Sequence, residues 1–120
     1  MLLGREDVNP NKPDNSGRTP LSYAAGKGYG EVVEMLLRQE KVNPDEPDHK
    51  GRTPLSYAAL SQGWVDPERF LSVVEMLLGR EEVNPDKLDN EGRTPLWYAA
   101  GAGCGGVVEM LLGREEVNPD

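Results

Sequence analysis

Apolar residues recur along the chain in two short blocks, which return three times and are separated by polar turns. The first block is residues 17–25 (GRTPLSYAA), which returns at 51–59 and, with one change, at 92–100. The second block, VVEMLL, occupies residues 32–37, 73–78 and 107–112. Its apolar positions fall at i, i+1, i+4 and i+5, which is one stripe of a helix. The pattern predicts two short helices per repeat and an all-α fold.

Each first block carries the signals of a helix start and a helix stop. Thr19 is a candidate N-cap, because its hydroxyl can accept a hydrogen bond from the first turn, and Pro20 follows at the first helical position. Gly28 is placed to end the helix. Between repeats, Asp48 and Gly51 and their counterparts predict a polar, hairpin-like turn.

The spacing of the blocks defines the repeats. Thr19 and Thr53 are 34 residues apart, whereas Thr53 and Thr94 are 41 apart, so the middle copy carries seven extra residues. One such unit is too small to bury a core of its own and must stack on its neighbours. We expect a single domain, 1–120, in which 1–16 ends a preceding repeat, 17–50 is repeat 1, 51–91 is repeat 2 and 92–120 is a truncated repeat 3. Both ends fall inside the repeat, which predicts a fragment of a longer array.

The motif Gly-x-Thr-Pro-Leu-x-x-Ala-Ala, followed by Gly, Val-Val-x-x-Leu-Leu and Val-Asn, resembles the ankyrin repeat over essentially the whole chain. It departs from the family consensus where His usually follows Thr-Pro-Leu, and where tyrosine stands at the next, aliphatic position. The segment 80–86 (REEVNPD) resembles the near-identical ankyrin arrays of fungal nucleotide-binding, immune-receptor-like signalling proteins. The resemblance implies an ankyrin-type helix-turn-helix solenoid with β-hairpin-like fingers, three stacked repeats and partial end units.

The resemblance also implies a module that binds another protein through its fingers and first helices, within a larger signalling protein. Exposed positions that differ between copies are the best candidates for that contact. The candidate partner-binding residues are Asn15, Ser16, Ser22, His49, Lys50, Ser56, Trp64, Arg69, Asn90, Glu91 and Trp97.

The extra residues of repeat 2 lie within 60–72, between its two helices. Asp66 followed by Pro67 is a strong helix start, and Val65 with Phe70 fits a hydrophobic staple. We therefore expect the second helix to begin near Asp66, to be longer than its counterparts and to bury Phe70. Trp64 is either an exposed anchor for a partner or a lid over the end of the first helix.

Three further features each allow two interpretations. Trp97, which replaces serine, either contacts a partner or packs on a following repeat. Tyr23, Tyr57 and Tyr98 form a ladder with one tyrosine per repeat. This tyrosine ladder is expected to line the core with its hydroxyls in water, in preference to forming a binding platform. Arg18, Arg52 and Arg93 form a second ladder. This arginine ladder either holds an acidic peptide or, as we expect, pairs with local carboxylates.

The charge and the reactive residues narrow the function. The net charge of −8 argues against nucleic acid and against an anionic membrane surface as partners. A single cysteine, Cys104, allows no internal disulfide and suits the cytoplasm or nucleus. His49 and Cys104 fall in different repeats, too few and too far apart for a nucleophile–base pair or a zinc site. We expect no catalytic residues, no metal and no cofactor.

Four functions are compatible with the sequence, and they follow from the most to the least expected. A protein-interaction module comes first. The alternative is a structural spacer or a self-stacking array with weak end-to-end association. A consensus-like scaffold without a partner is third, and the irregular insert argues against it. An enzyme is the least expected.

Overall fold

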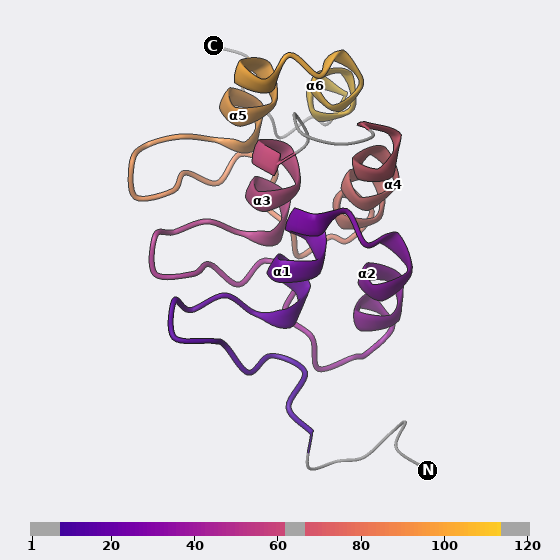
Figure 1. Cartoon of the computed structure of the whole chain (residues 1–120), viewed down its shortest axis with the longest axis vertical. Coiled ribbons are helices and arrows are strands. Elements are labelled where there is room, and N and C mark those ends of the chain that lie inside the picture. The colour runs from indigo at the N-terminus through magenta and orange to yellow at the C-terminus, as the bar shows by residue number, and fades with distance from the viewer. Residues whose placement is uncertain (1–7, 62–66, 114–120) are drawn as a thin grey trace.

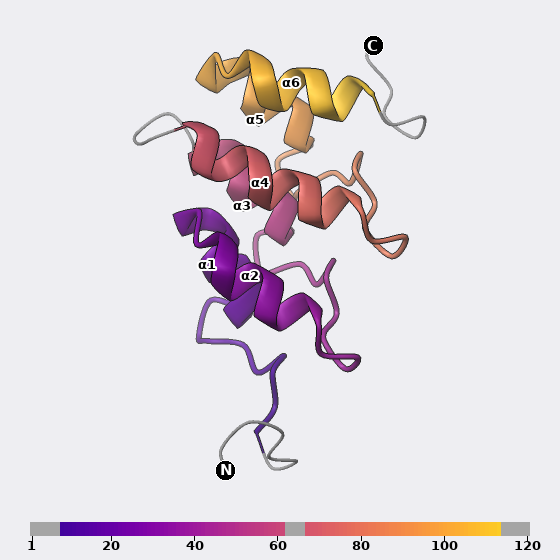
Figure 2. The same cartoon turned by 90° about the vertical axis from the view of Figure 1, so that its right-hand side faces the viewer.

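The helices stack in two rows in the computed structural model of the protein, which describes residues 8–61 and 67–113. The helices of these residues are α1 (Pro20–Lys27), α2 (Gly30–Leu37), α3 (Pro54–Ser61), α4 (Pro67–Leu78), α5 (Pro95–Ala102) and α6 (Gly105–Leu112). An inner row contains α1, α3 and α5, and an outer row contains α2, α4 and α6 (Figure 1). Figure 2 shows the outer row from its own side. The predicted all-α solenoid is confirmed.

The inner helices begin at threonine caps, as the sequence predicts. The Thr19 hydroxyl accepts the Ser22 amide hydrogen at 3.2 Å, and the Ser22 hydroxyl accepts the Thr19 amide hydrogen at 2.9 Å. This reciprocal pair satisfies two otherwise free donors of the first turn. In α5, the Thr94 hydroxyl still accepts the Trp97 amide hydrogen at 3.1 Å, but tryptophan cannot return the second bond. The cap of α5 is therefore weaker than the cap of α1.

The core combines the small alanines of the inner row with larger side chains from both rows. Paired alanines let adjacent inner helices approach closely, and branched side chains fill the space between the rows. The inner alanines, at most 3% exposed, are Ala24, Ala25, Ala58, Ala59 and Ala99. The larger core side chains, at most 1% exposed, include Leu21, Val33, Leu55, Phe70, Val73, Val74, Leu77, Val107 and Leu111. Each repeat packs on its neighbours through this core, which explains why the units stack.

The insertion in repeat 2 lengthens its outer helix. α4 has 12 residues, whereas α2 and α6 have 8 each, which confirms the predicted longer second helix. Phe70 is buried, also as predicted. A Cβ added to Gly28 would lie 3.2 Å from Phe70 Cε1, so the ring packs against the α1–α2 turn of the preceding repeat. The predicted contributions of Asp66, Val65 and Trp64 lie outside the described residues.

Each finger is a tight turn organised by its first aspartate; the fingers are residues 14–18, 48–52 and 89–93. In the second finger, Asp48 Oδ1 accepts the amide hydrogens of Lys50 and Arg52, both at 2.9 Å. The Asp48 amide donates to the Arg52 carbonyl at 2.9 Å, which closes the turn. The first and third fingers repeat this arrangement. Within the described residues, the fingers are hairpin-like turns without strands.

Adjacent fingers are joined through their main chains. The His49 amide donates to the Ser16 carbonyl at 3.0 Å, and the Asn90 amide donates to the Lys50 carbonyl at 2.9 Å. Gly51 has a φ of +79°, and a Cβ there would lie 2.9 Å from the Asn90 nitrogen. Only glycine allows the two fingers to approach this closely.

A second joint links the turns that follow the outer helices, and it is incomplete at Asp45. Asn11, which precedes repeat 1, accepts the Asn43 amide hydrogen at 2.8 Å and donates its side-chain N–H to the Lys41 carbonyl at 2.6 Å. Asp45 stands at the equivalent position and accepts the Asn84 amide hydrogen at 3.1 Å. Its other oxygen, Oδ1, is buried without a hydrogen bond, because a carboxylate has no hydrogen to donate. Burial raises the pKa of Asp45 above its ordinary value.

The substitution Asp45→Asn is expected to raise the free energy of unfolding by about 1–2 kcal/mol at neutral pH, since it satisfies the orphaned position. By repeat equivalence, the new amide faces the Glu82 carbonyl. Because the folded pKa of Asp45 is raised, the penalty of its charged form is full at neutral pH and disappears as the pH falls through that pKa. Urea unfolding at pH 7 and pH 4 should show an advantage for the variant that shrinks at pH 4. A pH-independent difference, or none, would contradict this account.

Candidate partner-binding surface

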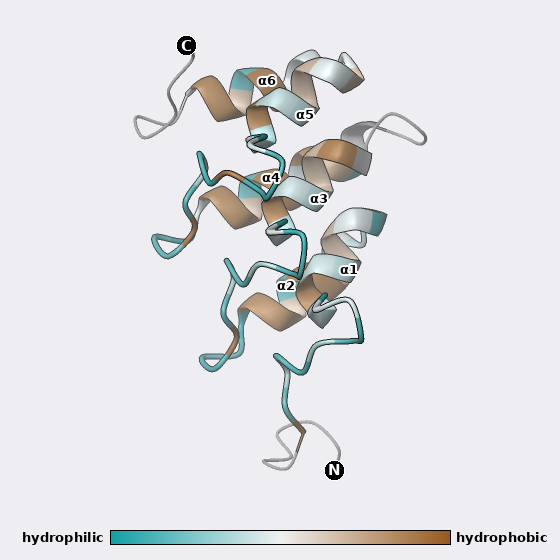
Figure 3. Ribbon diagram, turned by 90° about the vertical axis from the view of Figure 1, so that its left-hand side faces the viewer, coloured by the Kyte–Doolittle hydropathy of each residue, from teal (hydrophilic) through white to brown (hydrophobic). Residues whose placement is uncertain are grey.

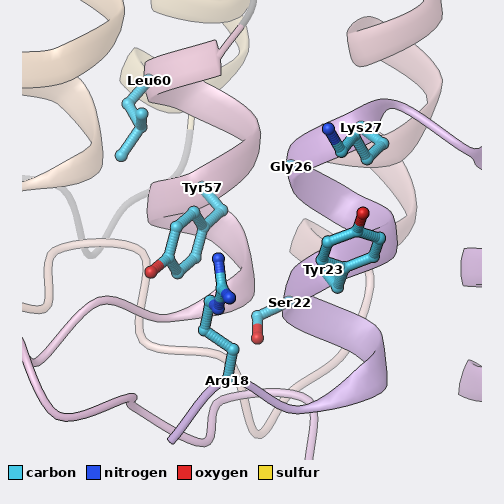
Figure 4. A pocket seen from close by; sticks show the side chains of 7 residues that line it. All are labelled: Arg18, Ser22, Tyr23, Gly26, Lys27, Tyr57 and Leu60. Carbon is cyan, nitrogen blue, oxygen red and sulfur yellow. The ribbon is translucent and has the colours of Figure 1, made fainter. Parts of the chain in front are cut away.

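A hollow runs along the inner face of the stack, between the fingers and the exposed sides of α1 and α3. One part, of about 210 Å³, lies between these two helices (Figure 4). The other part, of about 350 Å³, lies between the first two fingers. Arg18 and Tyr57 line both parts, so the two form one surface, which we call the groove. The groove residues are Asn15, Ser16, Arg18, Ser22, Tyr23, Gly26, Lys27, Asp48, His49, Lys50, Arg52, Tyr57 and Leu60.

Two tyrosines of the inner helices anchor the fingers to the stack. The Tyr57 hydroxyl donates to Asp48 Oδ2, and the Tyr98 hydroxyl donates to Asp89 Oδ2. Burial, and to a smaller extent the hydrogen bond to Asp48, raises the pKa of Tyr57 to about 12. The expectation of solvent-facing hydroxyls was therefore wrong for both residues, because each hydroxyl finds a carboxylate of its own repeat. The bond between Tyr57 and Asp48, which are both groove residues, fixes a wall of the groove.

Tyr23 departs from the other two tyrosines. Its side chain is 53% exposed and lines the groove, so the prediction of a core-lining ring was wrong for Tyr23. The aspartate of its own finger, Asp14, is occupied by Arg18, whose Nη2 lies 2.9 Å from Asp14 Oδ2. Hydrogen bonds from Arg18 and Ser16 lower the pKa of Asp14 below its ordinary value. Tyr23 thus keeps an accessible ring, over which the Lys27 ammonium lies 5.5 Å from the ring centre.

The arginine ladder pairs with nearby carboxylates, as predicted. Beside the Arg18–Asp14 pair, Arg52 bridges to the third finger, with Nη2 at 3.6 Å from Glu91 Oε1 and Nε at 3.8 Å from Asp89 Oδ2. Burial by itself raises the pKa of Asp89, but hydrogen bonds from Tyr98 and the third finger's backbone, together with the Arg52 charge, lower it below its ordinary value. Arg52 therefore ties the second finger to the third, whereas Arg18 pairs within its own finger.

The finger tips lie where the sequence predicts, in an accessible position. Four candidate residues, Asn15, Ser16, His49 and Lys50, line the groove and are exposed. Two more candidate residues, Asn90 and Glu91, lie on the third finger outside the groove, and each forms a hydrogen bond within the protein. Asn90 donates its side-chain N–H to the His49 carbonyl at 2.9 Å, and Glu91 accepts from Arg93 at 3.4 Å.

The structure gives the other candidates different roles. The hydroxyls of Ser22 and Ser56 are buried, and each lies 3.2 Å from its capping threonine, so they hold the helix start. Neither serine is therefore proposed to contact a partner. Arg69 is exposed, but its stem packs over Gly28, away from the fingers. Trp64 lies outside the described residues.

Trp97 is an exposed aromatic on α5 beyond the groove. It is 53% exposed, and its ring meets Tyr98 edge-on at 5.4 Å between ring centres. The guanidinium of Arg93 lies over the ring at 4.3 Å from the centre. This cation–π contact holds the indole in place and leaves much of its surface open.

Sequence reasoning missed Lys27 and Leu60 as groove residues and took Tyr23 and Tyr57 for core. A signal existed for the tyrosines, because in every repeat an aspartate precedes the tyrosine by nine residues. For Lys27, the spacing of four from Tyr23 places both on one helix face. Leu60 gave no such signal, because its exposure depends on how α1 and α3 pack.

Comparison with known families agrees with this architecture. A family model described as ankyrin repeats in three copies matches residues 1–78, and a model of a single ankyrin repeat matches residues 91–120. The chain belongs to the ankyrin repeat family. Ankyrin repeats are a non-catalytic fold whose members generally bind other proteins. No curated protein sequence matches the chain.

Other types of site have little support in this ankyrin stack. Among residues 8–61 and 67–113, no three His, Cys, Asp or Glu side chains gather in a way that would hold a metal ion. In the same residues, none of the helices combines the length and the apolar character needed to cross a bilayer.

Proposed function

We propose that this ankyrin stack holds a partner protein along its inner face, through the groove, the finger tips and the insert of repeat 2, as part of a larger signalling protein. The observation that carries the proposal is the groove itself, which spans two fingers and two helices of neighbouring repeats. A concave surface lined by an accessible aromatic and several polar side chains suits a segment of polypeptide.

The accessible aromatics support this proposal, because such side chains often dominate the energy of protein interfaces. Tyr23 is 53% exposed within the groove, and Trp97 is equally exposed on α5. The insert that contains Trp64 begins close after Leu60, itself a groove residue, so we propose that it extends the contact surface.

The proposal is tested by capture from a native extract, with bound proteins identified by mass spectrometry. The baits are the wild-type chain, the groove variant Tyr23→Ala and the control Tyr29→Ala, whose ring is 47% exposed but does not line the groove. We expect Tyr23→Ala to weaken binding of a captured partner by about tenfold, while Tyr29→Ala leaves it unchanged. A fourth bait, with the insert cut back to regular repeat length, tests the contribution of Trp64.

Two outcomes would contradict the proposal. Equal capture by all baits would move the binding site away from the groove and the insert. Recovery of copies of the chain alone, with mass in solution rising with concentration, would favour the structural, self-stacking array instead. The cytoplasmic or nuclear location stays a prediction from the single cysteine.

A further inference from the structure

The groove has a charge opposite to that of the whole chain. Among the side chains that the structure describes, it is lined by the four cations Arg18, Lys27, Lys50 and Arg52 and by one carboxylate, Asp48, although the chain carries a net charge of −8. That carboxylate is buried and already accepts hydrogen bonds from the Tyr57 hydroxyl and two backbone amides. It is therefore a poor acceptor for an incoming cation, and the accessible charge of the groove is positive.

Two of the four cations form no ion pair with any carboxylate whose side chain the structure describes. Arg18 and Arg52 pair with finger carboxylates, whereas among those described side chains no Asp or Glu lies within ion-pair distance of the ammonium of Lys27 or Lys50. Lys27 lies in the part of the groove between α1 and α3, and Lys50 lies in the part between the fingers. Both side chains are exposed. Exposed positive charge is thus present in both parts of the groove.

The part of the groove between α1 and α3 is partly apolar, and its Tyr57 also lines the part between the fingers. Figure 4 shows the Tyr23 and Tyr57 rings on adjacent helices, with Leu60 further along α3. The fingers themselves are mostly hydrophilic (Figure 3). A ligand that satisfied this surface would carry negative groups at two points and an apolar group between them.

We propose that the groove recognises an extended acidic segment of the partner protein, with two carboxylate side chains that flank an apolar one. One carboxylate pairs with Lys27, the other pairs with Lys50, and the apolar side chain packs on the tyrosines. The inference rests on the proposed function, because it names the chemistry of the partner that the groove holds. An acidic segment is repelled by most of this negative chain, so complementarity confines it to the groove.

The experiment selects peptides from a random displayed library on the immobilised chain and measures their affinities by fluorescence anisotropy. We expect selected peptides to be enriched in Asp and Glu at two separated positions, and their affinities to fall with added salt. The double variant Lys27→Glu with Lys50→Glu should weaken their binding roughly tenfold or more. The matched control is Lys12→Glu with Lys41→Glu, which makes the same change in net charge at exposed lysines outside the groove. Circular dichroism confirms that both variants fold.

The outcomes separate this inference from the proposed function. Peptides without acidic enrichment, or peptides that bind the Lys27/Lys50 variant as well as the wild type, would overturn the acidic specificity. The binding function would stand in that case if Tyr23→Ala still weakened those peptides. Failure to select any peptide would count against both. Equal weakening by the Lys12/Lys41 control would reduce the effect to net charge and would also overturn the inference.

Discussion

Replacing Phe70 by alanine is expected to lower the free energy of unfolding by about 3–5 kcal/mol, among the largest effects of any single substitution in the chain. The ring is 1% exposed and packs between α4 and the α1–α2 turn of the preceding repeat. Its removal leaves a cavity at the junction of two repeats, so both lose packing at once. Urea unfolding followed by circular dichroism measures the change.

Tyr29 provides the matched control, because the alignment of the repeats places it at the same position as Phe70. Its ring is 47% exposed, and Tyr29→Ala is expected to cost about 1 kcal/mol or less. If Phe70→Ala prevents folding altogether, Phe70→Leu retains most of the volume and should give a measurable, smaller loss. Similar losses for Phe70→Ala and Tyr29→Ala would show that the insert adds no core.

The second large effect is expected at the joint between fingers. Gly51→Ala should lower the free energy of unfolding by about 2–4 kcal/mol, from a left-handed backbone that costs about 1–2 kcal/mol and from the displaced third finger. A Cβ at Gly51 lies 2.6 Å from Asn90 Oδ1 and 2.9 Å from the Asn90 nitrogen. To relieve these contacts, the finger must give up the bond between the Asn90 amide and the Lys50 carbonyl.

Gly92 separates the two contributions to that effect. Its φ is +78°, almost that of Gly51, but within the described part of the chain a Cβ there meets nothing within 4 Å. Gly92→Ala should therefore cost only the backbone strain, about 1–2 kcal/mol. Thermal unfolding of the two variants side by side measures the difference. Identical losses would mean that contact between fingers contributes nothing to stability.

The sequence predicts those features that depend on local spacing. The threonine caps, the inner alanines and the longer α4 all follow from residues within a few positions of one another, so their pattern is visible in one repeat. Burial of Phe70 follows from its place on the same stripe as Val74 and Leu77. The all-α solenoid then follows because each unit needs a neighbour.

The groove is less predictable, because it depends on contacts between repeats and on small differences among copies. Tyr23 and Tyr57 occupy identical sequence contexts, yet one hydroxyl is bound to its finger aspartate and the other ring is exposed. The difference arises where Arg18 takes the first finger's aspartate. Likewise, nothing near Asp45 in the sequence indicates that one of its oxygens is buried without a partner.

The joint between fingers has a consequence for how such a protein can change over generations. The bonds from His49 to Ser16 and from Asn90 to Lys50 both run from main chain to main chain, although the side chains at these tips differ. The joint between fingers thus tolerates most replacements of the tip side chains, provided that the glycine that follows each tip is kept. New side chains can be tried at the binding surface one finger at a time while the stack stays intact, so specificity can diverge faster than the fold that carries it.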